Sequence, residues 1–278
     1  MAESFVSAPV EKAVILARGL GTRMRRQDSA AALDRGQAEA ADTGVKALIP
    51  IGRPFLDFVL SALADAGYRQ VCLVIGPEHT AVHEYYTRTA APSRVAVSFA
   101  IQERALGTAD AVAAAAAFTG DDRFLMINSD NYYPVSAIEA LRRLGRTGVA
   151  VFERDSLVRE GNVDPARVRQ FAVVRTDAAG DLLDIIEKPD AQTIEALGPE
   201  VFVSMNCWLF GPAIFRACAS IGLSPRGELE LTDAVRYSMT TLGERYAAIP
   251  FRAPVLDLSS RADIAAVAAR LAGTEVRL

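Results

Sequence analysis

The segment LARGLGTRMRR, at residues 16–26, combines two glycines with four arginines directly after an apolar run. Glycines after a strand let successive backbone N–H groups surround an anion, and phosphate oxygens bind such a loop without obstruction by side chains. Gly19 and Gly21 meet this need. Their spacing is neither the GxxxxGKS/T of a P-loop nor the GxGxxG of dinucleotide folds. From these residues alone, the segment is either a phosphate cradle or a basic surface turn.

A carboxylate and two histidines are further candidates for metal chemistry. Asp130 closely follows the apolar run FLMIN at residues 124–128. Magnesium is usually held by one or two carboxylates together with phosphate oxygens and water, and ligands of open α/β sheets bind outside the carboxyl ends of the strands. Asp130 is therefore expected to hold Mg²⁺. His79 and His83 lie four residues apart on a predicted helix, and we interpret them as a surface pair because the sequence offers no third ligand nearby.

Alternating patterns predict the elements that position these residues. Short apolar runs alternate with helical patterns in the first half, which is typical of an α/β fold with a mostly parallel sheet and helices on both faces. Gly67 is predicted to end a helix just before a strand. The second half predicts a mixed sheet with a hairpin. The predicted strands are 13–17, 71–75, 95–101, 124–128, 148–154, 202–210 and a pair within 171–189, and the predicted helices are 54–66, 80–87 and 108–117.

Composition excludes several classes of protein. Hydrophobic residues make up 51% and charged residues 23% of the 278-residue chain, and the formal net charge is −4. These values favour an ordinary globular protein over a disordered or nucleic-acid-coating one. Residues 1–16 lack the pattern of a secretory signal, and no window approaches the roughly 18 apolar residues of a membrane span. We therefore expect a cytoplasmic protein without nucleic-acid or membrane partners, whose three widely spaced cysteines are reduced core residues.

A series of motifs runs from about residue 12 to about residue 270. In order they are LARGLGTRM, VKALIPIG with the helix and strand after it, QERALGTADAV, MINSDNYYP, DIIEKPD, SMNCWLFGPAIF, RGELELTDAV and VLDLSSRADI. Together they resemble the LAxGxGTRL signature and the later motifs of the sugar-1-phosphate nucleotidylyltransferases. The resemblance implies a Rossmann-like three-layer α/β/α fold, the GT-A-like fold of nucleotide-diphospho-sugar transferases. It also implies that a sugar-1-phosphate oxygen attacks the α-phosphate of a nucleoside triphosphate, which releases pyrophosphate and leaves a nucleotide sugar.

The same resemblance implies a role for each matching residue. Arg23, on the leaving pyrophosphate, and Lys46, near the α-phosphate, would be catalytic together with Asp130, since cations and positioning accelerate such transfers. Asp130 and Asp257 would hold Mg²⁺, although an aspartate after a strand is also a common turn residue. Asn206 could equally cap a turn. The implied nucleotide-binding residues are Leu16, Ala17, Gly19, Gly21, Thr22, Arg23, Gln102, Gly107 and Thr108, and the implied sugar-phosphate-binding residues are Asn131, Glu187, Lys188, Asn206 and Arg226.

The base and the acceptor stay open. Gln102 stands five residues before Gly107, as in thymidylyl- and uridylyl-transferring members, which favours dTTP or UTP. However, GTADAV also resembles the adenylyl-transferring loop, and GTA occurs in guanylyl-transferring members too. Arg18 stands where the family has a small residue, and its side chain could either crowd the cradle or add a phosphate contact. Val45 stands where the family has proline. These departures favour an atypical acceptor such as a cyclitol phosphate. A non-sugar phosphate acceptor and a non-catalytic nucleotide or sugar-phosphate sensor are the alternatives.

The chain is predicted to form one domain over residues 1–278. Its nucleotide-binding half would span about 8–134 and its sugar-phosphate-binding half 135–278. The alanine-rich stretch 30–42 lengthens the loop before Lys46, either as a lid over the site or as a solvent-facing embellishment. The implied partners are a nucleoside triphosphate and a sugar-1-phosphate, and a homo-oligomer is left open.

Overall fold

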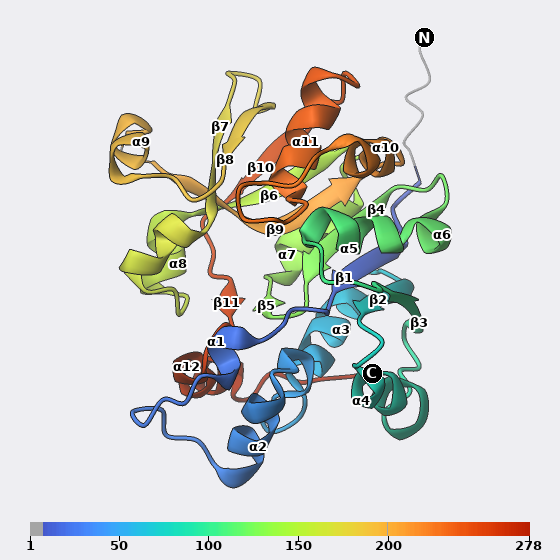
Figure 1. Cartoon of the computed structure of the whole chain (residues 1–278), viewed down its shortest axis with the longest axis vertical. Coiled ribbons are helices and arrows are strands. Elements are labelled where there is room, and N and C mark those ends of the chain that lie inside the picture. The colour runs from blue at the N-terminus through green and yellow to red at the C-terminus, as the bar shows by residue number, and fades with distance from the viewer. Residues whose placement is uncertain (1–7, 199) are drawn as a thin grey trace.

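A central sheet with helices on both faces organises the chain (Figure 1). The computed structural model describes residues 8–198 and 200–278. The predicted domain and the segment 1–16 considered above both begin at residue 1, so their first seven residues lie outside the described part. The strands are β1 Lys12–Leu16, β2 Gln70–Ile75, β3 Ala96–Ile101, β4 Phe124–Asn128, β5 Asn131–Tyr132, β6 Gly148–Glu153, β7 Ala172–Thr176, β8 Leu182–Ile186, β9 Phe202–Phe210, β10 Ala247–Phe251 and β11 Leu256–Asp257.

The helices include short 3₁₀ and π segments. In chain order they are α1 Thr22–Arg25, α2 Arg35–Thr43, η1 Lys46–Leu48, α3 Phe55–Asp65, α4 Thr80–Glu84, η2 Tyr85–Thr89, α5 Thr108–Ala114, α6 Ala116–Thr119, α7 Val135–Arg142, α8 Arg154–Arg159, η3 Pro165–Gln170, α9 Ala191–Ala196, α10 Ala213–Ser220, α11 Leu231–Thr240 and α12 Arg261–Leu271.

The main sheet is mostly parallel, as the sequence predicts. Over the described residues its strands lie in the order β10-β6-β9-β4-β1-β2-β3. β1 is parallel to β2 and β4, and β2 is parallel to β3. β9 alone on this path runs against its neighbours β4 and β6. The hairpin β7–β8 pairs antiparallel and joins the sheet through β9, which makes the second half mixed, and Figure 1 shows it with α9 at the end of the molecule away from β3.

Alternate residues of each strand enter two separate cores. Ala13 and Ile15 of β1 lie in the core that contains α3, α7 and α12, whereas Val14 lies in the core that contains α5, α10 and α11. Because both faces are covered, the strands are nearly continuous apolar runs rather than alternating ones. This arrangement confirms the predicted three-layer α/β/α architecture. The three cysteines are free and buried, also as predicted.

Helix α3 and its ending show how the buried layer is built. All its residues except the last are buried. Gly67, with φ of 95°, follows the helix and its N–H donates to the Ala64 carbonyl at 3.1 Å, which confirms the predicted helix-ending glycine. The buried Asp57 carboxylate accepts hydrogen bonds from Arg53, Tyr85 and Tyr86, so the charge within the helix is fully paired.

The alanine-rich insertion forms α2, which packs against α1 and η1. Asp34 caps its start through the Gln37 N–H at 2.8 Å, and Gly44, with φ of 75°, ends it. Asp42 forms an ion pair with Arg261 of α12. Among the described residues, none of α2 lines the pocket described below. The helix therefore does not act as a lid in this structure; it holds the backbone two residues before Lys46.

No helix in the described part of the chain is long and apolar enough to span a lipid bilayer.

Candidate active site

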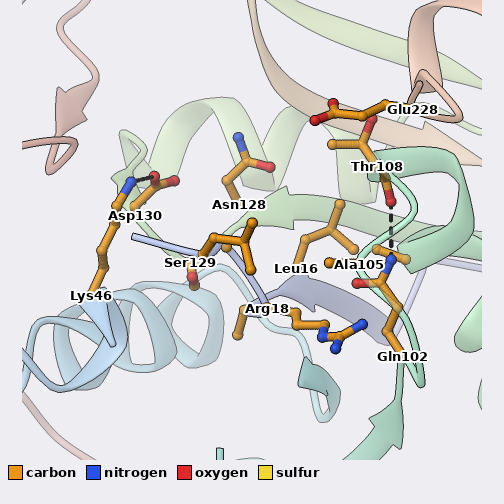
Figure 2. Close-up of a pocket in the computed structure, with 15 residues that line it drawn as sticks. Leu16, Arg18, Lys46, Gln102, Ala105, Thr108, Asn128, Ser129, Asp130 and Glu228 are labelled. Atoms are coloured by element: carbon orange, nitrogen blue, oxygen red, sulfur yellow. Dashed lines mark hydrogen bonds and ion pairs between the residues drawn. The ribbon is translucent and has the colours of Figure 1, made fainter. Parts of the chain in front are cut away.

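A pocket of about 260 Å³ lies at the carboxyl ends of β1, β3 and β4 (Figure 2). Ligands of parallel α/β sheets bind at this edge because the loops that leave the strands gather there. Among the residues that line the pocket are eight predicted site residues, namely Leu16, Ala17, Gly19, Lys46, Gln102, Gly107, Thr108 and Asp130. Segments far apart in sequence are thus brought to one cavity.

Lys46 and Asp130 form an ion pair at one end of this pocket. Lys46 Nζ lies 2.7 Å from Asp130 Oδ2, and the two side chains are 13% and 22% exposed. Lys46 begins η1, directly after the turn at Gly44, while Asp130 lies two residues beyond the end of β4. A cation and a carboxylate held together and partly shielded from water can bind a phosphate group and a metal ion side by side.

The two glycines of the loop after β1 have different structural roles. A Cβ on Gly19 would meet nothing within 4 Å, so this residue leaves the backbone open toward the pocket that it lines. A Cβ on Gly21 would lie 2.2 Å from the Gly44 carbonyl oxygen, and Gly21 has φ of 62°. Gly21 is thus required by the close approach of the loop to Gly44, which indirectly places Lys46.

Three predicted residues of the same loop, Gly21, Thr22 and Arg23, lie outside the pocket lining. Thr22 and Arg23 begin α1 and are exposed. Arg23 Nη1 donates to Gln170 Oε1 at 3.2 Å. Arg25 of the same segment has Nε donating to the Thr43 carbonyl at 3.0 Å and packs against Gly44.

The loop after β3 forms the other end of the pocket. Gln102 is buried, and its Nε2 donates to the Gly107 carbonyl at 3.1 Å and to Asp110 Oδ2 at 2.7 Å. Gly107 has φ of 120°, and a Cβ there would lie 2.5 Å from the Leu229 carbonyl oxygen. Thr108 Oγ1 accepts the Leu231 N–H at 3.0 Å. The loop that carries Gln102 is therefore joined directly to the segment RGELE at residues 226–230.

The predicted sugar-phosphate residues partly gather beside that segment. Arg226 Nη2 lies 3.8 Å from Glu187 Oε1 and 2.6 Å from Glu230 Oε1. Burial raises the pKa of Glu187, with Arg226 opposing and the carboxylates of Glu230 and Asp233 adding to the rise. A carboxyl group can hydrogen-bond to hydroxyl groups in either protonation state, so Glu187 suits the contacts predicted with sugar hydroxyls.

Backbone strain marks two more of these residues. Lys188 has φ of 46° and Asn206 has φ of 57°, and among the described residues they alone have positive φ without being glycine. Asn206 lies in β9 where the pairing with β6 shifts register between Ala150 and Val151. Strained residues and β-bulges concentrate at functional sites, where they aim a side chain away from the regular pattern. Lys188 is exposed.

Asp257 and Asn131 are buried beside the pocket rather than in its lining. The strands β5 and β11 pair Asn131 with Asp257, and Asn131 Nδ2 donates to Asp257 Oδ1 at 3.1 Å. Ser259 Oγ donates to the same carboxylate at 2.9 Å, and Arg167 forms an ion pair with it. Burial, with the Asp130 charge nearby, raises the pKa of Asp257 to about 6, and Arg167 opposes this rise.

These contacts decide how well the residues fit a magnesium ion. In the described ranges, no group of three or more His, Cys, Asp or Glu side chains could hold a metal by itself. Asp130 fits, because it is a hard oxygen ligand on the pocket wall and phosphate oxygens and water complete such sites. Asp257 fits less well, since protein donors already contact its oxygens.

The prediction of a surface histidine pair holds only for His83, which is exposed. His79 is buried just before α4, and its Nδ1 accepts the Gly76 N–H at 3.2 Å. Burial lowers the pKa of His79. His83 packs its ring on Phe99 at 4.5 Å between centroids. The predicted surface position was wrong for His79 because a tight turn, and not a helix face, determines its surroundings.

Sequence reasoning missed several residues of the pocket. Asn128 and Ser129 line it directly before Asp130, and their place at the end of an apolar strand was the available signal. Glu228 enters from the RGELE segment. Arg18, for which the sequence leaves open a crowding of the cradle or a phosphate contact, also lines the pocket. Arg167, on Asp257, carried no sequence signal, since it lies in a short 3₁₀ segment.

Comparison with known proteins agrees with this geometry. The family model described as nucleotidyl transferase matches residues 40–254. A glucose-1-phosphate thymidylyltransferase of Streptomyces griseus is 32% identical over 229 residues, which are 81% of this chain and 56% of that protein. A UTP–glucose-1-phosphate uridylyltransferase of Haloferax volcanii, AglF, is 25% identical over 225 residues, or 81% of this chain and 82% of that one. The chain thus spans little more than half the length of the first curated relatives that it matches.

Solved structures share the fold. A UDP-glucose pyrophosphorylase complexed with UDP-glucose superposes with a TM-score of 0.72 at 18% identity, over 96% of this chain and all of that one. A likeness at this identity concerns the arrangement of strands and helices, which is the three-layer architecture described above.

Proposed function

The chain belongs to the nucleotidyl transferase family, and we propose that it is an enzyme that joins a nucleoside triphosphate to a sugar-1-phosphate, with release of pyrophosphate. The observation that carries this proposal is the Lys46–Asp130 pair, 2.7 Å apart, in a pocket that also contains Gly19 and the Gln102 loop. A cation and a potential metal ligand lie at one end, and a loop that can contact a base lies at the other. This division suits a nucleotide that lies along the pocket.

In the proposed reaction, an oxygen of the acceptor phosphate forms a bond to the α-phosphorus, and the bond from that phosphorus to the bridging oxygen of the β-phosphate breaks. Lys46 contacts the α-phosphate and neutralises its developing charge, while the open backbone at Gly19 approaches the phosphates. The leaving pyrophosphate carries its own charge, so no proton donor is needed at that oxygen. The pocket walls position the two reactants in line.

Magnesium is the proposed cofactor, since the family generally depends on a divalent metal. Asp130 would hold the ion, and when bound it would supply a second positive charge on the phosphate oxygens. Asp257 would become a second ligand of the ion only if its ion pair with Arg167 were broken. Arg23 would need to leave Gln170 and turn from the surface to contact the pyrophosphate.

The acceptor side is proposed to comprise Glu187, Lys188, Asn206 and Arg226. The names of the relatives favour a glucose-1-phosphate-like acceptor and a uridine or thymidine nucleotide. Cyclitol phosphates remain in the proposal as acceptors because Arg18 and Val45 depart from the usual pattern. A cytoplasmic location stays a prediction from the sequence, and a homo-oligomeric state stays open.

The test is a matrix of UTP, dTTP, CTP, ATP and GTP against sugar-1-phosphates, cyclitol phosphates and choline phosphate, with magnesium and detection of pyrophosphate. The proposal expects release that requires one nucleotide and one acceptor together. Nucleotide binding without release in every combination would overturn it in favour of a sensor. Release with choline phosphate alone would move the acceptor to the non-sugar class.

A further inference from the structure

Arg18 places a buried and unused hydrogen-bond donor at the pocket. Its side chain is only 9% exposed. Nε and Nη2 lie 3.3 and 3.5 Å from the two carboxylate oxygens of Glu78, and Nη2 also donates to the Glu103 carbonyl at 3.4 Å. Nη1 is buried and has no hydrogen-bond partner anywhere in the described part of the chain. A buried donor without an acceptor is costly, so a ligand that supplies one is favoured.

The position of Arg18 determines which part of a nucleotide it can reach. Figure 2 shows its guanidinium extending toward Gln102, whereas Lys46 and Asp130 lie together at the opposite end of the pocket. The contact with the Glu103 carbonyl fixes the guanidinium beside the end of β3. If phosphate chemistry occurs at Lys46 and Asp130, Arg18 lies at the end that receives the base.

The charge balance points the same way. Glu78 already pairs with Arg18, and this pairing contributes to the lowered pKa of Glu78, after the hydrogen bond from its own backbone. Lys46 is also paired, with Asp130, but a metal ion on Asp130 would leave the lysine charge to the phosphates, whereas Glu78 stays paired with Arg18. Arg18 instead offers one oriented N–H whose charge is largely compensated. Such a donor suits an uncharged carbonyl oxygen.

Gln102 supplies the complementary acceptor. Both hydrogen bonds of its side chain use Nε2, toward Gly107 and Asp110, which leaves Oε1 for a ligand. Figure 2 shows this oxygen on the side of the amide that faces Arg18. We infer that Arg18 and Gln102 together recognise a base in which a ring N–H lies next to a carbonyl, as in uracil, thymine and guanine. Arg18 donates to the carbonyl oxygen and Gln102 accepts the N–H.

The turn after β2 is built to hold Arg18 in this place. A Cβ on Gly76 would lie 2.4 Å from Glu78 Oε1 and 2.5 Å from Arg18 Nε, so only glycine leaves room for the ion pair. His79 holds the same turn by accepting the Gly76 N–H. Three residues of the turn therefore support one guanidinium, which makes Arg18 a specificity-determining residue and not an incidental surface charge.

This inference rests on the proposed function for the direction in which the nucleotide lies, and its test is binding without acceptor, so that turnover is not needed. Calorimetry would compare UTP, dTTP, GTP, CTP, ATP and inorganic tripolyphosphate on the wild type, on Arg18→Ala and on the matched control Arg88→Ala, an exposed arginine that does not line the pocket. We expect Arg18→Ala to weaken UTP, dTTP or GTP by about tenfold or more. The affinities for ATP and tripolyphosphate should change less than about threefold in Arg18→Ala, and Arg88→Ala should leave all of these affinities unchanged.

Thio-substituted nucleotides test the wild-type protein directly. Sulfur accepts hydrogen bonds poorly, so either 2-thio-UTP or 4-thio-UTP should bind about tenfold more weakly than UTP, and this difference should vanish in Arg18→Ala. If Arg18→Ala lost affinity equally for UTP, ATP and tripolyphosphate, or kept the wild-type affinity for UTP, the inference would be overturned. Arg18-dependent base preference without pyrophosphate release would refute the proposed function alone. Turnover with an unchanged base preference in Arg18→Ala would refute this inference alone.

Discussion

Lys46 Nζ and Asp130 Oδ2 lie 2.7 Å apart although 84 residues separate them in sequence. The contact joins the end of the α2 insertion to the carboxyl end of β4. Gly21, Gly44 and η1 determine where the lysine lies, and the β4–β5 turn determines where the carboxylate lies. The pair therefore depends on two segments that are far apart in the sequence.

Loss of the Lys46 ammonium should reduce turnover far more than stability. Lys46→Ala removes the cation proposed to act on the α-phosphate, and removal of one such stabilising group lowers kcat by about 10²–10³. Lys12→Ala is the matched control, because Lys12 also forms a half-buried ion pair, with Asp122 at 2.7 Å, but at the opposite end of β1. Steady-state kinetics on both variants would decide; equal losses in kcat would contradict the assigned role.

The two glycines of the loop should respond differently to alanine. Gly21→Ala places a Cβ 2.2 Å from the Gly44 oxygen at a left-handed φ of 62°, so it should lower the free energy of unfolding by roughly 2–4 kcal/mol. Gly19→Ala has open space and should change stability by less than about 1 kcal/mol, yet weaken nucleotide binding. Urea denaturation and calorimetry measure the two effects. A stable Gly21→Ala protein would refute the packing argument.

Replacement of Lys188 by glycine should stabilise the fold and weaken acceptor binding. Lys188→Gly accommodates φ of 46° and should raise the free energy of unfolding by roughly 0.5–1 kcal/mol. The same variant should raise KM for the acceptor with little change in nucleotide affinity. Lys188→Ala, which loses the ammonium but keeps the strain, should raise KM without the gain in stability. An unchanged acceptor KM in both variants would remove Lys188 from the site.

Acid should destabilise the folded protein through His79. Burial lowers its pKa from 6.5, with Arg18 and Arg25 adding to the effect and Glu78 opposing it. The unfolded chain therefore binds the proton more readily, so this contribution to stability is complete above pH 6.5 and is lost as pH falls through the lower folded-state pKa. Urea denaturation between pH 5 and 7.5 should show that the free energy of unfolding falls less on acidification for His79→Gln than for the wild type. The same dependence of the unfolding free energy on pH in both proteins would contradict the prediction.

The fold was largely predictable because its signals are local. The strands around Val14, Leu73 and Ile127 are continuous apolar runs, and Gly67 ends α3 where the pattern predicts. The alanine-rich insertion was not predictable to the same degree. Its position depends on the Asp42–Arg261 ion pair, which joins segments more than 200 residues apart.

The candidate site was predictable where a residue follows a strand directly. Asp130 was located in this way, whereas Gln102 was assigned by its spacing from Gly107 in the motif that resembles the family's base loop. The ion pair between Arg167 and Asp257 and the placement of Arg18 over Gly76 depend on contacts between distant segments, which residue patterns do not encode. Arg23 was assigned by motif alone, and in this structure its side chain contacts Gln170 at the surface.

The central claim is tested most directly by Asp130→Asn beside the wild type, with pyrophosphate release and nucleotide affinity measured on the same preparations. The change keeps the shape of the side chain and removes the charge that would hold magnesium. The account predicts that the wild type releases pyrophosphate in the presence of an acceptor phosphate, and that Asp130→Asn still binds the nucleotide but loses at least about 10²-fold in turnover. Turnover in Asp130→Asn close to that of the wild type would contradict it.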